Sequence, residues 1–299
     1  MEIEQEVVPL INSVSGIVDR IVTLLSKLPF LDGKARDDVI KQVKALLKRV
    51  DIDVKEWANR ELEKLARDHD EDLSALLPAF LVASPHIMSI VEKVSSDLQA
   101  VTQRTIRGVE AYAGSLSSPA SKSRTIGKLV GKGTAANLEA LSRPQRILME
   151  SQLKASLDRN FVRVLGRNGR IYRYAMDYWT AMNAQMSRGL LRRQISIFRT
   201  LEAGYDLVQI TNNPSMHGDF CDLYRGKVFS ISGTHPFYAP LSDVPNGGTP
   251  FHPWCKHDML PFTSNVEDAE LADIPPEFLE LAQDPTTTIN DFQKLWIEV

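Results

Sequence analysis

The first 113 residues carry apolar side chains at helical spacing. Between residues 3 and 28 these positions recur at alternating intervals of four and three, the a/d spacing of a helix that buries one narrow face. They are Ile3, Val7, Leu10, Val14, Ile17, Ile21, Leu24 and Leu28. Such a seam needs another helix to cover it, in the same chain or in a neighbouring copy. The segment 29–33, with its proline and glycine, ends this helix.

More helices are predicted on the same grounds. We expect them over residues 35–50, 51–67, 73–82 and 84–113. Asp51 and Asp53 would cap the second of these, and Ser84 with Pro85 would begin the last. The polar residues 68–72 are interpreted as a turn that carries His69 on the surface.

The second half of the chain mixes helices with short strands. Residues 114–133 are rich in Ser, Gly and Lys, which predicts a flexible basic linker. Helices are then expected over 134–142, 145–160 and 175–203, and strands over 161–165, 171–174, 206–211 and 227–231. An Asn-Gly pair at 168–169 is typical of a hairpin turn.

The predicted fold class is α+β, mostly α. A helical N-terminal half precedes a C-terminal domain built from one long helix and a small sheet, and an extended acidic tail follows. The expected domains are a helical arm at 1–113, the linker at 114–133, the α+β domain at 134–263 and the tail at 264–299.

Charge is distributed unevenly, although the net charge is only −3. Residues 102–193 hold 17 basic and 5 acidic side chains, a net +12, whereas residues 264–299 hold 1 basic and 9 acidic, a net −8. The basic middle can meet nucleic-acid phosphates or an acidic protein, or it can be a solvated face neutralised by acidic ends. The candidate contacts for DNA or a partner are Lys128, Lys132, Arg188, Arg192 and Arg193.

Membrane insertion is not expected from the sequence. No uninterrupted apolar run approaches the roughly 18 residues of a transmembrane helix. The first residues, MEIEQEVV, lack the basic region of a signal peptide.

Both cysteines and four of the six histidines lie between residues 216 and 262. His217 and Cys221 form one pair, and Cys255 and His257 form another after a loop rich in Pro, Gly, Asn and Ser. Two such pairs can supply the four ligands of a structural zinc ion. Two other readings stay open: buried free thiols with histidines that hydrogen-bond the loop, and a disulfide, which suits a reducing cytoplasm poorly.

The same region resembles a known family. The run RNGRIYRYAMDYWTAMNAQMSRGLLRRQ is followed by GYDLVQITNN, HGDFCDLYRGKVFSISG and HPWCKHDMLPF. These motifs, over about residues 160–263, are similar to the C-terminal domain of phage minor capsid proteins: the minor capsid protein 2 family and, more distantly, the Mu protein F type of head-morphogenesis protein. The matching positions are Gly169, Arg170, Tyr174, Tyr178, 204–208, Cys221, 226–233 and 252–257.

The resemblance implies a structural role and no enzyme. It implies a minor capsid protein bound at or near the portal inside a tailed-phage head, which aids head assembly or DNA packaging and ejection. The expected partners are portal protein, major capsid or scaffold protein and packaged DNA, in a virion assembled in the host cytoplasm. The alternative is a metal-dependent nuclease or toxin-like enzyme that acts through the Cys/His cluster with Asp219, Asp222 and Asp258.

Overall fold

The computed structural model describes residues 4–77, 85–116, 142–156, 162–165, 169–213 and 220–263. Its fold is α+β and mostly α, with a small antiparallel sheet in the C-terminal part, which confirms the predicted class. The chain forms two compact units that interleave along the sequence. Unit 1 comprises Met1–Glu4, Trp57–Leu98 and Met182–Val299, and unit 2 comprises Gln5–Glu56 and Gln99–Ala181.

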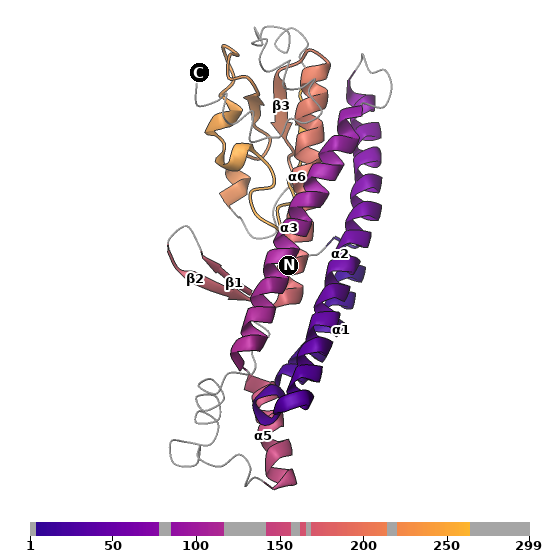
Figure 1. Ribbon diagram of the computed structural model, residues 1–299. Coiled ribbons are helices and arrows are strands. Elements are labelled where there is room, and N and C mark those ends of the chain that lie inside the picture. Colours follow the sequence, from indigo (N-terminus) through magenta and orange to yellow (C-terminus); the bar gives the residue numbers. More distant parts are fainter. Residues whose placement is uncertain are drawn as a thin grey trace. The chain divides into compact units, whose positions relative to one another are not determined.

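Unit 2 begins with an antiparallel pair of helices. Helix α1 (Val8–Leu25) and the first part of α2 (Gly33–Leu76) run side by side, joined by a short 3-10 turn at Leu28–Phe30 (Figure 1). Most of the predicted seam is buried, namely Val7, Leu10, Val14, Ile17, Ile21 and Leu28, whereas Leu24 is half-buried and Ile3 lies outside the described residues. Val18, Val22 and Leu25 are buried as well, so the apolar face is wider than predicted. The segment Val8–Phe30 is long and apolar enough to cross a membrane by length and composition alone. Its buried seam is also what a core helix requires.

Helix α2 corrects the predicted boundaries at 51 and 68. Asp51, Asp53 and the residues 68–72 all lie inside one continuous helix. No glycine or proline occurs between residues 34 and 77, and an interior aspartate alone costs only about 0.7 kcal/mol relative to alanine. Asp53 is also paired with Arg49 one turn earlier, at 2.6 Å.

Unit 2 is completed by the end of α3 (Pro85–Leu116), by α5 (Arg143–Ser156) and by a hairpin. The hairpin pairs β1 (Val162–Leu165) with β2 (Ile171–Tyr174) antiparallel, and both strands were predicted. Gly169 has a φ of 73°, the left-handed conformation that the Asn-Gly turn requires. The Tyr174 ring stacks on Trp179 at the start of α6, with ring centroids 5.1 Å apart.

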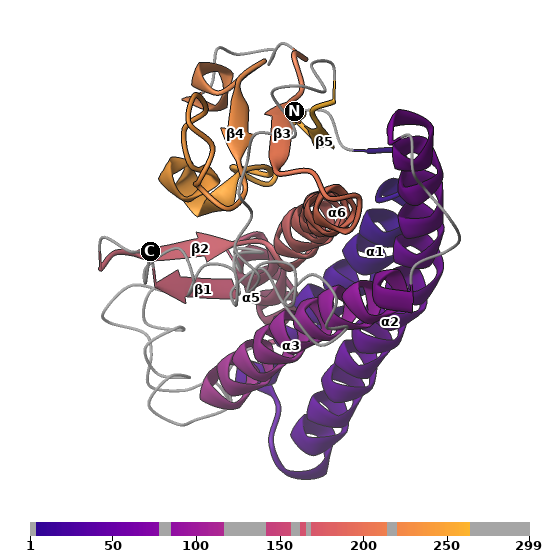
Figure 2. The same cartoon turned by 90° about the horizontal axis from the view of Figure 1, so that it is seen from above.

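Unit 1 contains the three-stranded sheet. Strand β3 (Leu207–Ile210) lies between β4 (Val228–Ser230) and β5 (Met259–Pro261), antiparallel to both (Figure 2). Helix α6 (Met176–Glu202) leads into β3 through Gly204, whose φ is 79°. Strand β5 was not predicted, because its three residues are too few to show an alternating pattern.

Several predicted segments lie wholly or partly outside the described residues. The linker beyond Leu116, the helix at 134–142 up to residue 141, and the tail from 264 are not among the described residues. Residues 114–116, which were assigned to the linker, continue α3.

Candidate metal centre

One buried carboxylate holds together the strands that lead to the centre. Asp206, at the entrance to β3, is fully buried and accepts hydrogen bonds from the Ser230 hydroxyl and, at 2.7 Å, from the Ser232 backbone N–H. Burial raises the pKa of the Asp206 carboxyl group, and these hydrogen bonds act in the opposite direction. The Ser230 hydroxyl oxygen also accepts from the Gly233 N–H at 2.8 Å. The aspartate thus fixes the end of β4 and the turn after it.

The long loop after β4 is seated against helix α6. Pro250, which follows a cis peptide bond, packs on Gly189 of the helix. A Cβ atom at residue 189 would lie 2.7 Å from Pro250 Cγ, so only glycine fits there without movement. This contact fixes the chain just ahead of Phe251 and His252.

Three potential metal ligands meet at the end of that loop. The 3-10 turn Phe220–Leu223 presents Cys221, which is fully buried. A tight turn, closed by the Cys255 N–H donating to the His252 carbonyl at 3.0 Å, brings His252 and Cys255 together. The ligand atoms of Cys221, His252 and Cys255 all lie within 4.8 Å of one another.

His257 lies next to this group. Its Nδ1 is 3.6 Å from Cys255 Sγ, and Cys221 Sγ is 3.4 Å from His252 Nε2. In a tetrahedral site with bonds of about 2.3 Å to sulfur and about 2.05 Å to nitrogen, a sulfur and a nitrogen ligand stand about 3.6 Å apart. Both measured pairs match that separation. Cys221, His252 and Cys255 therefore form a group that could hold a metal ion, with His257 beside Cys255 but outside the group of three.

The surroundings of His257 also suit a ligand. The residue is 2% exposed, and its Nε2 lies 3.5 Å from the Asp222 carboxylate but has no hydrogen bond within the described ranges. Histidines that bind metal through one nitrogen commonly orient the other towards a carboxylate. Burial lowers the pKa of His257, which leaves the ring neutral at pH 7 with a lone pair to donate.

The thiol of Cys255 is held in its protonated form when no cation is near. Burial is the largest cause and raises the pKa of this thiol. A zinc ion would displace that proton, because thiolate is the form that binds metal.

The predicted ligand set is therefore partly corrected. The structure brings Cys221 and Cys255 together as predicted, but the histidine within the three-residue group is His252. His257 lies beside Cys255, and His217 falls outside the described residues. A signal for His252 was present: it precedes Cys255 at the x2 spacing that zinc sites use.

The described carboxylates of the proposed nuclease cluster do not converge on an open site. Asp222 faces His257, while Asp258 is 3.4 Å from Arg192. Asp219 lies outside the described residues.

Two of the three α6 arginines that we expected to contact DNA are buried. Arg188 and Arg193 are 4% and 3% exposed. Arg188 is paired with Glu4, and Arg192 lies 3.2 Å from Glu4 as well as near Asp258. Arg188 and Arg192 are ion-paired inside unit 1, and Arg193 is buried with its Nε lacking a hydrogen bond among the described residues. Burial therefore disfavours Arg188 and Arg193 as contacts for DNA or a partner, while the assignment of Arg192 stays a prediction.

Arg193 has a different role. It donates to the Asn246 carbonyl at 2.6 Å, and burial lowers the pKa of its guanidinium to about 10. It therefore braces the loop at 241–248. Lys128 and Lys132 lie outside the described residues.

His69 is a second correction among the histidines. It was expected on the surface but is 7% exposed, with Nε2 3.0 Å from the Ser196 hydroxyl of α6. Its pKa is lowered, chiefly by burial.

The fold and the site together define a mostly helical protein with a small sheet that carries a candidate Cys/His metal centre. Comparison with protein-family models, curated proteins and solved structures found no match.

Proposed function

We propose that the chain is a structural minor capsid or head-morphogenesis protein of a tailed phage, bound at or near the portal and aiding head assembly or DNA packaging and ejection. One observation supports this proposal: residues of the motifs that resemble the minor capsid family contact one another. Asp206 of GYDLVQITNN accepts hydrogen bonds from Ser230 and Ser232 of HGDFCDLYRGKVFSISG, and Cys221 of that same motif lies beside His252 of HPWCKHDMLPF. These bonds give the motif residues a part in holding the fold together, and the assignment to a phage head rests on the resemblance of the motifs.

The metal centre has a structural part in this proposal. We assign Cys221, His252, Cys255 and His257 as the four ligands of one zinc ion. With four protein ligands, no coordination position stays open for substrate or water. The ion would join the turn that holds Cys221 to the segment that ends the loop. Little regular structure lies between residues 232 and 258 to hold that segment otherwise.

The ligand assignment is tested by metal analysis of purified variants. We expect about one zinc per chain, and loss of zinc in Cys255→Ser and His252→Ala. His217→Ala is the decisive comparison, because His217 replaces His252 in the set predicted from sequence. His86→Gln is a matched control, since His86 lies in α3 and pairs with Glu202 at 3.8 Å. If His252→Ala retains zinc and His217→Ala loses it, the assignment is wrong.

The role in the particle is tested by mass spectrometry of purified phage heads. We expect the chain in a few copies per particle, at a fixed ratio to portal protein. Removing its gene should reduce the yield of filled heads. Absence from the particles would refute the proposal.

The enzyme alternative predicts a different result from the purified protein. Cleavage of plasmid DNA in the presence of a divalent metal, lost in Asp222→Asn, would favour the nuclease and contradict a purely structural role.

A further inference from the structure

The hairpin of unit 2 places two arginines directly opposite each other. In the antiparallel register of β1 and β2, Arg163 pairs with Arg173, so their Cβ atoms stand about 5 Å apart on one face. Both side chains are exposed. Among the described residues, neither has a carboxylate within ion-pair distance. Like charges in this position destabilise a strand pair, so this face is suited to an anion that bridges the two guanidinium groups.

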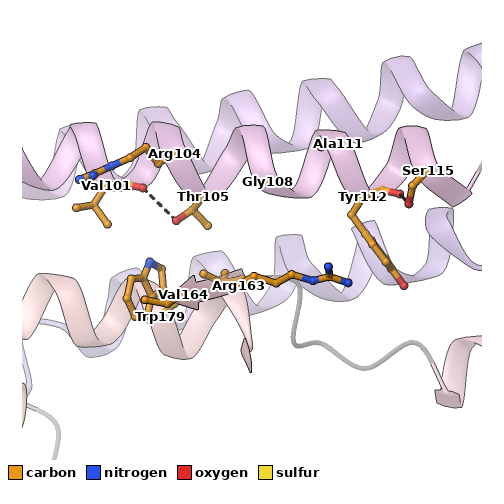
Figure 3. Close-up of a pocket in the computed structure, with 11 residues that line it drawn as sticks. Val101, Arg104, Thr105, Gly108, Ala111, Tyr112, Ser115, Arg163, Val164 and Trp179 are labelled. Atoms are coloured by element: carbon orange, nitrogen blue, oxygen red, sulfur yellow. Dashed lines mark hydrogen bonds between the residues drawn. The ribbon is translucent and has the colours of Figure 1, made fainter. Parts of the chain in front are cut away.

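A groove beside the hairpin adds a third arginine. It encloses a cavity of about 590 Å³ between α3 and β1. Arg104 of α3 and Arg163 of β1 both line it; Figure 3 shows Arg104 lying along α3, and Arg163 on the opposite side together with Val164 and with Trp179 of α6. The described chain supplies no carboxylate partner for Arg104 either; its Nε donates to the Ala100 carbonyl at 3.3 Å.

The shape of this surface favours duplex DNA as the partner. The major groove of B-form DNA admits a two-stranded β-ribbon, which is what β1 and β2 form. Guanidinium groups bind phosphate oxygens through pairs of parallel hydrogen bonds. The exposed Ile171, at 64%, leaves an apolar side chain near the turn of the ribbon, where a groove wall would cover it.

We propose that the β1–β2 hairpin and the groove beside it, through Arg104, Arg163 and Arg173, bind the phosphate backbone of duplex DNA. The inference rests on the proposed function, because packaged DNA is the duplex named there. It gives the basic middle of the chain its contacts, in place of the buried arginines of α6.

The test is binding of a short fluorescein-labelled DNA duplex to the purified full-length chain, measured by anisotropy across a series of salt concentrations. Arg163→Gln with Arg173→Gln should weaken binding. It should also reduce the magnitude of the negative slope of log affinity against log salt by about 1.8, because each lost phosphate contact removes about 0.9 from that slope. Arg104→Gln should lower the slope by about 0.9.

Two variants separate binding from folding. Arg173→Glu sets opposite charges across the ribbon, so it should keep or increase the hydrogen-exchange protection of β1 and β2 while it weakens DNA binding. Arg60→Gln, an exposed arginine of α2 paired with Glu61, should leave affinity and slope unchanged.

Unchanged affinity and slope in the double variant would overturn the inference. So would binding that depends on these arginines but prefers an acidic protein to DNA. Detection of the chain in phage heads is a separate measurement, so failure of the DNA site leaves the proposed function standing, and absence from heads refutes the proposed function independently.

Discussion

Replacing Gly189 with alanine tests the packing of the loop after β4, which ends at His252 and Cys255, against helix α6. In an exposed helix interior, glycine to alanine raises the free energy of unfolding by about 0.8–1.0 kcal/mol. At Gly189 the new Cβ would lie 2.7, 3.0 and 3.1 Å from three atoms of the Pro250 ring. Carbon atoms pack best at about 3.5–4.0 Å, so ring and helix must separate by about 1 Å. The closed ring cannot rotate away from the contact.

The expected change follows from these opposing terms. Overpacking of this kind costs about 1–3 kcal/mol, so the net effect of Gly189→Ala should range from near zero to about 2 kcal/mol of destabilisation. Gly16→Ala in α1 is the matched control, because nothing lies within 4 Å of a Cβ built there. That variant should stabilise by up to about 1 kcal/mol. The two substitutions should therefore differ by about 1–3 kcal/mol.

Hydrogen exchange read by mass spectrometry is the suitable assay, because the two units need not unfold together. Peptides from 182–202 and 241–262 report on unit 1, and peptides from α1 report on unit 2. Gly189→Ala should lower protection in the first set and weaken zinc retention, since His252 follows Pro250 by two residues. Equal or greater protection of both peptides of unit 1 would show that Pro250 does not pack on α6.

Three further predictions concern unit 1. If zinc holds the loop at 232–258, then a chelator, or Cys255→Ser, should make that loop cleavable by protease. Protease resistance that persists in chelator would contradict the proposed structural role of zinc. Asp206→Asn should lose stability relative to the wild type as pH falls: because the folded-state pKa of Asp206 is raised, its contribution is present at low pH and lost as pH rises through that pKa. Urea unfolding at several pH values checks this, and a gap that widens with rising pH would refute it. Arg199→Lys breaks two parallel bonds to Asp70, at 2.5 and 2.7 Å, and should cost about 2 kcal/mol; a change below about 0.5 kcal/mol would show that the pair contributes little.

Much of the fold was determined by local patterns in the sequence. The seam of α1, the hairpin around Gly169, the long helix before Gly204 and the strand after it were all predicted close to their observed bounds. These elements depend on periodicity and on residues with restricted backbone conformations, both of which act over a few neighbouring residues. The two cysteines were likewise recognised as one site from their chemistry and spacing.

Other features were decided only by tertiary structure. Asp51 has the residue type of a helix cap, but no glycine or proline lies nearby, and helix α2 continues through this position. Arg188 and His69 read as surface residues, yet Glu4 and Ser196 supply partners that lie 184 and 127 residues away in sequence. His252 joined Cys221 because a turn and the Pro250 contact place it there. Sequence spacing shows which side chains can act together, whereas the partner that satisfies a buried charge or completes a ligand set depends on contacts between distant segments, which only the folded chain specifies.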